Sequence, residues 1–172
     1  STLMLFNEDD LDECDRQLKL AKPLYNQKLH FLASIYADLD GKKLKRYYLK
    51  NKAAKIEHAR NKNIKRFRKK IISCVRKALK QSKEVYVTIQ LNHIEDASNW
   101  RNYYDFDPLK KYYGYSLYDI AFKPFNDLYK EELDKVYLSL TGEMGASVKL
   151  YPKSYSEVLK RLPEKLNVGI SL

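Results

Sequence analysis

A short stretch of strict alternation constrains the fold of this chain more than any other feature of its sequence. Between Glu84 and Leu91, every second residue is apolar, beginning with Val85 and Val87, and the residues between them are Tyr, Thr and Gln. Successive side chains of a β-strand point to opposite faces, so the pattern predicts a strand with one face in a hydrophobic core. The chain must therefore build a sheet and cover one side of it.

Two more strands are expected to flank this one. Residues 146–151 and 166–171 each contain a short alternation of apolar residues. Between them, Ser154 and Glu157 have the spacing of a capping box, which typically starts a helix. Residues 122–140 return to steps of three and four between apolar positions, and this period predicts another helix.

The first half of the chain predicts a pair of helices. Apolar residues recur every three or four positions in residues 8–39 and again in residues 42–82, as in helices with one buried face. Asp40 and Gly41 lie between the two segments and form a turn signal. We therefore expect two antiparallel helices joined at this turn.

Together these segments predict an α+β fold. A long N-terminal helical hairpin would pack with a small mixed three-stranded sheet and accessory helices. The predicted parts are residues 1–83, the hairpin with its basic second helix, and residues 84–172, the α+β part. The chain has 172 residues, a size that one core can support, and no linker composition marks residue 83. One continuous domain is therefore the alternative.

Positive charge is concentrated in the second predicted helix. Residues 42–83 contain 18 Lys or Arg and one acid, Glu57, although the whole chain has a net charge of only +11. On a helical wheel these bases lie opposite the apolar stripe and form a predicted basic ridge of roughly 38 Å. A break at residues 61–63 would divide it into two shorter pieces. The ridge consists of Lys55, Lys62, Lys65, Arg66, Lys69, Lys70, Arg76, Lys77 and Lys80.

A one-sided cationic helix suits the phosphate backbone of a nucleic acid, because each Lys or Arg that neutralises a phosphate releases counterions. Lysines outnumber arginines in the chain, which favours phosphate contacts over the bidentate contacts that read bases. The sequence therefore predicts a non-enzymatic nucleic-acid-binding protein, for DNA or RNA.

The basic ridge also fits alternatives to a nucleic acid. An acidic protein partner would make the chain an interaction module, such as an inhibitor or a complex subunit. An anionic membrane surface or a solvated helix face would also accommodate the bases. Acids between Glu8 and Asp15 could pair with the ridge inside a hairpin, but the eight acids of residues 1–41 cannot neutralise 18 bases.

A second feature is an aromatic segment that also holds Arg101, Lys110 and Lys111. Aromatic rings among bases can stack on unpaired nucleobases, although most rings in a small domain belong to its core. Exposure of the rings distinguishes the two cases. The aromatic residues are Trp100, Tyr103, Tyr104, Phe106, Tyr112, Tyr113, Tyr115 and Tyr118.

Signatures of enzymes are weak. The five glycines form neither a GxxxxGK[ST] phosphate loop nor a GxGxxG turn, and the three histidines lie far apart, so we expect no cofactor, no metal site and no catalytic residues. A nuclease using Asp105, Asp107 and Lys110 is the weakest hypothesis.

The remaining features concern location. Cys14 and Cys74 lie 60 residues apart outside any CxxC pair, and we expect both to be reduced and buried. No apolar run is long enough to span a membrane, and residues 1–10 lack a basic leader, so we expect an intracellular, cytoplasmic protein. Residues 65–70 also match the pattern of a nuclear-import cluster, which makes a nuclear location the second option.

Overall fold

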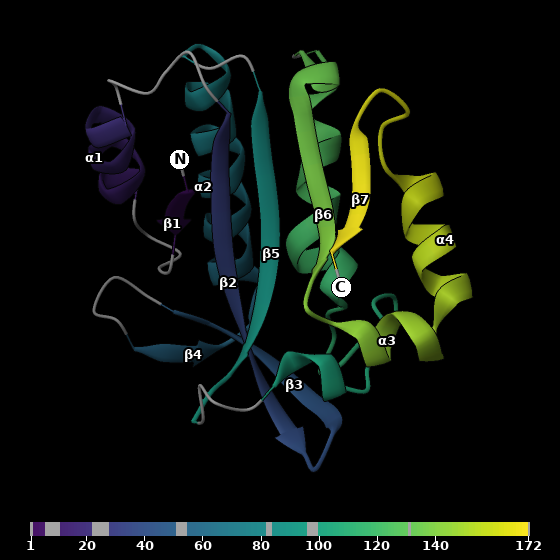
Figure 1. Ribbon diagram of the computed structural model, residues 1–172. Coiled ribbons are helices and arrows are strands. Elements are labelled where there is room, and N and C mark those ends of the chain that lie inside the picture. Colours follow the sequence, from purple (N-terminus) through teal and green to yellow (C-terminus); the bar gives the residue numbers. More distant parts are fainter. Residues whose placement is uncertain are drawn as a thin grey trace.

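The computed structural model describes residues 2–5, 11–21, 28–50, 55–81, 84–95, 100–130 and 132–171. Helices and strands alternate along much of this part of the chain (Figure 1). Short 3₁₀ or π segments, labelled η, connect several of them. The elements are β1 (Thr2–Leu5), α1 (Leu11–Ala21), β2 (Leu29–Asp40), β3 (Lys43–Lys50), β4 (Ile56–His58), α2 (Asn61–Leu79), β5 (Val85–His93), η2 (Arg101–Tyr103), η3 (Tyr118–Phe122), η4 (Lys123–Leu128), η5 (Leu133–Lys135), β6 (Val136–Gly142), α3 (Gly145–Leu150), α4 (Pro152–Arg161) and β7 (Asn167–Ser171).

The described strands form one sheet. Its order is β4-β3-β2-β5-β6-β7, and β1 pairs with β2 outside this path. Strands β2, β5, β6 and β7 run parallel to one another, whereas β2, β3 and β4 form an antiparallel meander. Strand β2 therefore joins the meander to the parallel half of the sheet.

One face of the sheet packs against the hydrophobic core. Val85, Val87, Ile89 and Leu91 of β5 are at most 1 % exposed, as the alternation predicted. In Figure 1 the helix α2 and the helical segment η3–η4 lie behind the strands, and their apolar side chains belong to the same buried cluster. The opposite face carries half-buried side chains. The helices thus cover the face of the sheet that carries the apolar residues of its alternating strands.

The predicted α+β architecture with an N-terminal helical hairpin is wrong. The molecule is a mixed α/β fold, in which residues 29–40 and 43–50 are strands. In residues 29–40 the helical steps of Leu29, Leu32, Tyr36 and Leu39 coexist with an alternation at every second position, and pairing with β1, β3 and β5 selects the strand. Residues 8–10 and 22–27 of the predicted first helix lie outside the described residues.

The turn at Asp40 and Gly41 is real, but it connects two strands. Gly41 has a φ of 58°, which glycine adopts without steric cost, and β2 and β3 pair in antiparallel fashion on either side of it. Asp-Gly between two extended segments is a strong hairpin signal. The same dipeptide ends helices as well, so it does not by itself distinguish a helical from a β-hairpin.

Two other predictions of secondary structure are also wrong. Residues 146–151 lie in α3 and its cap instead of in a strand, because so short an alternation does not separate strand from helix. Residues 122–140 were expected to be one helix, but the helical part ends early and Val136–Gly142 is β6, the true neighbour of β5. The predicted helix near residue 157 and the last strand are confirmed as α4 and β7, but α4 begins at Pro152 and not with a capping box at Ser154.

Close packing at Gly142 gives a first testable prediction. A Cβ atom there would lie 3.1 Å from the backbone oxygen of Ile89 and 3.2 Å from Cγ2 of Thr88. We expect Gly142→Ala to lower the free energy of unfolding by about 1–3 kcal/mol, because the backbone of β5 has to give way. Chemical denaturation measures the change.

Gly169→Ala in the edge strand β7 is the matched control, because nothing lies within 4 Å of the added Cβ atom. Its free energy of unfolding should change by no more than about 0.5 kcal/mol. Equal stabilities of the two variants would show that β5 and β6 are not packed as described.

Candidate nucleic-acid interface on α2

Helix α2 is rich in lysine and arginine. Polar contacts fix the position of its first turn. The backbone N–H of Arg60 donates to Oδ1 of Asn63 (2.7 Å), and Nδ2 of Asn63 donates to the carbonyl of His58 (2.8 Å). These bonds fix the entry into the helix, and α2 begins at Asn61, where the sequence allowed a break. Ile64, Phe67 and Ile71 then face the sheet as a buried stripe.

The opposite side of α2 carries most of the predicted basic ridge. Among its nine residues, Lys62, Lys65, Lys69, Arg76 and Lys80 are exposed, and Arg66 and Lys77 are half-buried. Lys70 is only 3 % exposed and does not belong to the surface. Lys55 lies ahead of β4, outside the helix. The helix-borne ridge therefore runs from residue 62 to residue 80, roughly 27 Å along the axis.

A basic groove lies along this side of α2. It has a volume of about 630 Å³ and one acidic residue, Asp127 of η4, in its lining. Ile72 and the small side chain of Ser73 form part of its surface, between the basic residues of successive turns. The basic lining residues are Lys65, Arg68, Lys69, Arg76, Lys77 and Lys80.

Three of these cations also hold the molecule together. The guanidinium of Arg68 donates to the carbonyl of Asp119, and that of Arg76 donates to the carbonyl of Asp127 (2.9 Å). Both bonds attach α2 to the neighbouring η3–η4 segment. Nζ of Lys77 lies 2.6 Å from Oδ1 of Asp15 in α1. This ion pair between α1 and α2 is one instance of the internal pairing that the sequence allowed.

Three exposed lysines of the groove are available to contact a ligand. Lys65, Lys69 and Lys80, here called the lysine row, form no hydrogen bond or ion pair within the described part of the chain. They are four and eleven residues apart, about one and three helical turns, so they lie nearly in line along α2. The three lysines of the row are thus exposed, aligned and without an ion pair in the described part of the chain.

Sequence reasoning missed one residue of the groove. Arg68 was absent from the predicted ridge, yet it lines the groove beside Lys65 and Lys69. Arg68 follows Lys65 by three residues, and residues at this spacing lie on one face of a helix. The sequence therefore contained the signal that could have placed Arg68 in the ridge. What the sequence could not give is the position of η4, which supplies Asp127 to the lining of the groove.

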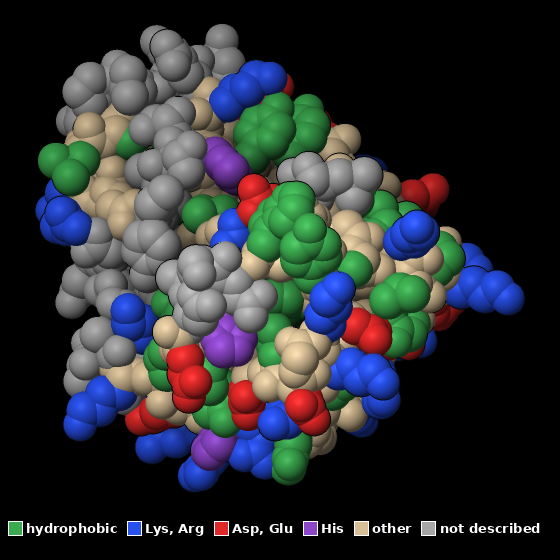
Figure 2. Space-filling view, turned by 60° about the horizontal axis from the view of Figure 1, so that its bottom comes forward, with side chains coloured by type: hydrophobic (Ala, Val, Ile, Leu, Met, Phe, Trp, Pro, Cys, Tyr) green, Lys and Arg blue, Asp and Glu red, His purple; other side chains and the backbone are tan. Residues whose placement is uncertain are grey.

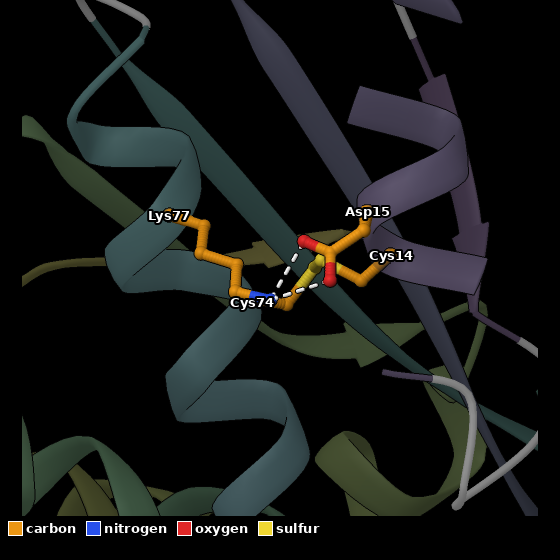
Figure 3. The surroundings of a disulfide bond; sticks show 4 residues. All are labelled: Cys14, Asp15, Cys74 and Lys77. Carbon is orange, nitrogen blue, oxygen red and sulfur yellow. Dashed lines mark hydrogen bonds and ion pairs between the residues drawn. A yellow bond between two sulfur atoms is a disulfide. The ribbon is translucent and has the colours of Figure 1, made fainter. Parts of the chain in front are cut away.

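Helix α1 is attached to α2 by a covalent bond. Cys14 and Cys74 form a disulfide with their Cα atoms 6.0 Å apart, and the expectation of two reduced thiols is wrong. Both cysteines are fully buried, as expected. Figure 3 shows that the Asp15–Lys77 ion pair lies beside the disulfide, between the same two helices. The sequence separation of 60 residues concealed how closely the fold brings these positions together.

The aromatic segment divides into core and surface residues. Tyr104 and Phe106 are fully buried, whereas Trp100, Tyr103 and Tyr113 are exposed. Each of two exposed rings carries a cation, since Nζ of Lys42 lies 4.9 Å from the centroid of Tyr103 and the guanidinium of Arg46 lies 3.4 Å from that of Tyr113.

The carboxylates of the hypothetical nuclease site make other contacts. Asp105 accepts a hydrogen bond from the Tyr151 hydroxyl (2.8 Å), and Asp107 accepts one from the backbone N–H of Leu109 (2.8 Å). Among the side chains that the structure describes, no group of three or more His, Cys, Asp or Glu could hold a metal ion.

Comparisons with known proteins found no match. No protein-family model, no curated protein and no solved structure matches the chain. None of the helices in the described ranges has both the length and the apolar character needed to cross a membrane.

Proposed function

We propose that this protein binds the phosphate backbone of a nucleic acid through the basic groove of α2. The observation that carries the proposal is the lysine row, three aligned and exposed cations without a partner among the described residues. Over the roughly 22 Å from Lys65 to Lys80, a duplex presents about a dozen phosphates, so three lysines can find partners in any sequence register. Binding of this kind is independent of sequence.

The surroundings of the row favour phosphate contact. Arg68 and Arg76 are held by carbonyls of η3 and η4, and Lys77 is held by Asp15, so these side chains are already positioned around the groove. Only Asp127 opposes an incoming anion within the lining. A mixed-sign surface, the usual composition of a solvated helix face, would not have this imbalance.

The test is replacement of the row by glutamine. Lys65→Gln, Lys69→Gln and Lys80→Gln together should preserve the helix, because glutamine is nearly as good a helix former as lysine. The slope of log affinity against log salt for a fluorescent duplex should become shallower by up to about 2.7, or about 0.9 per lost contact. Duplexes of unrelated sequence should lose affinity alike.

The matched control removes three exposed lysines elsewhere, with Lys153→Gln, Lys160→Gln and Lys165→Gln. This variant has the same net charge as the test variant but an intact row. Equal losses in both variants would assign binding to net charge and overturn the role of the groove. If the wild type does not bind duplex or single strands at low salt, the proposal fails, and an acidic protein partner takes the place of the nucleic acid.

A further inference from the structure

A second groove lies away from α2, at the end of the molecule formed by the β2–β3 turn, η2 and α3. It has a volume of about 510 Å³, which is within the usual range for small-molecule sites. Figure 2 shows this end, where hydrophobic side chains lie among both basic and acidic ones. Its lining consists of Asp40, Lys42, Lys43, Tyr103, Asp105, Ala146, Lys149 and Leu150, and it is here called the Tyr103 groove.

Two large apolar side chains are exposed in this groove. Tyr103 is 50 % exposed and Leu150 is 55 % exposed, and they come from different elements, η2 and α3. The ring of Tyr103 already attracts a cation, Nζ of Lys42, at 4.9 Å from its centroid. A half-exposed aromatic ring and an aliphatic side chain in one groove suit a flat, aromatic ligand.

Charged groups around these side chains restrict the ligand further. Lys42, Lys43 and Lys149 supply three cations, whereas Asp40 and Asp105 supply two carboxylates. A simple anion would be opposed by the carboxylates, and an apolar ligand would remove charged groups from water without replacing their solvation. A nucleobase with a phosphate offers a partner to both kinds of charge, because its amino group donates to a carboxylate and its phosphate accepts from lysines.

The lining is fixed in place by hydrogen bonds. The N–H of Asp105 donates to the carbonyl of Lys42 (2.7 Å), and the N–H of Gly145 donates to Oδ1 of Asn102 (2.8 Å), which ties α3 to η2. The hydrogen bond to Asp105, together with burial, raises the pKa of Tyr151 to about 12. The Tyr151 hydroxyl donates this hydrogen bond and holds the Asp105 carboxylate in position.

We infer that the Tyr103 groove binds a nucleobase carrying a phosphate, stacked on Tyr103 with its phosphate on the lysines. This site is separate from the lysine row, and its ligand is either a free nucleotide or one nucleotide of an unpaired strand. Neither source depends on duplex binding by α2.

The chain contains a reporter for this site. Trp100 is its single tryptophan, and its ring lies edge-on to Tyr103 with the centroids 5.0 Å apart. Adenosine monophosphate and a single-stranded octamer of deoxyadenosine are the two probes, titrated while the fluorescence of Trp100 is recorded. Calorimetry gives the affinities independently of the fluorophore, which matters because substitution of Tyr103 changes the surroundings of Trp100.

Tyr103→Ala should weaken binding of both probes at least about fivefold, the effect of losing one stacking contact, and Tyr103→Phe should restore it. Tyr113→Ala is the matched control, because Tyr113 is an exposed tyrosine of the same segment outside the groove lining. Lys42→Gln with Lys149→Gln should reduce the affinity for adenosine monophosphate but hardly that for adenosine. All of these variants should retain duplex binding through α2.

The two probes distinguish the sources of the ligand. A Tyr103-dependent affinity that is more than about tenfold higher for the octamer identifies an unpaired strand, and similar affinities identify a free nucleotide; both results support base stacking. The inference is overturned if neither probe binds at millimolar concentration, or if Tyr103→Ala and Tyr113→Ala behave alike. Either result leaves the test of the lysine row unaffected.

Discussion

Val87→Asp should unfold the protein or lower its free energy of unfolding by several kcal/mol. Val87 is 1 % exposed and lies in β5 between Phe31 of β2 and Leu138 of β6, so an aspartate there would be a buried charge without a partner. Thermal unfolding followed by circular dichroism measures the effect.

Ile170→Asp is the control for this substitution. It introduces the same charge in place of an apolar strand residue, but Ile170 is 45 % exposed in the edge strand β7. Its melting temperature should stay close to that of the wild type. If Val87→Asp were equally mild, the buried face of β5 would have been assigned to the wrong side of the sheet.

Reduction of the disulfide should have the second large effect. Cys14 and Cys74 close a loop of about 60 residues, and the loss of such a cross-link costs about 4 kcal/mol in the chain-entropy model. For a chain of this length that corresponds to a fall in melting temperature of roughly 8–16 °C. Melting curves with and without a thiol reductant test this directly.

A variant with Cys14→Ala and Cys74→Ala separates the cross-link from other actions of the reductant. Its melting temperature should be low in both conditions, whereas that of the wild type should fall only when reductant is present. Native protein whose two thiols react rapidly with a labelling reagent before any reduction would contradict the disulfide itself.

The parts of the fold that the sequence predicted correctly are those with one dominant period. Residues 85–91 alternate without exception, and they form the predicted strand β5. The helix predicted near residues 154–162 is also present as α4, although it begins at Pro152 and no side chain caps it at Ser154. Residues 29–40 and 136–142 satisfy a helical and a strand period at once. Their state depends on partners far away in the sequence, which a single local pattern does not reveal.

The same limit applies to the candidate site. The basic side of α2 could be predicted because charge and apolar residues follow one helical period within residues 61–79. The removal of Lys70 from the surface depends on tertiary packing, and so does the engagement of Arg76 and Lys77 by η4 and α1. The Tyr103 groove combines η2, α3 and the β2–β3 turn, segments more than 40 residues apart, so no contiguous motif announces it.

The disulfide also keeps part of the fold covalently joined when the backbone is cut. Residues 14–74 form a covalent ring that contains β2, β3, β4 and most of α2. A protease that cuts once inside this ring, for example at the Asp40–Gly41 turn, leaves both fragments joined until a reductant is added. The same turn is therefore a natural place to open new chain ends in a circularly permuted protein, since Cys14 and Cys74 would keep α1 fastened to α2.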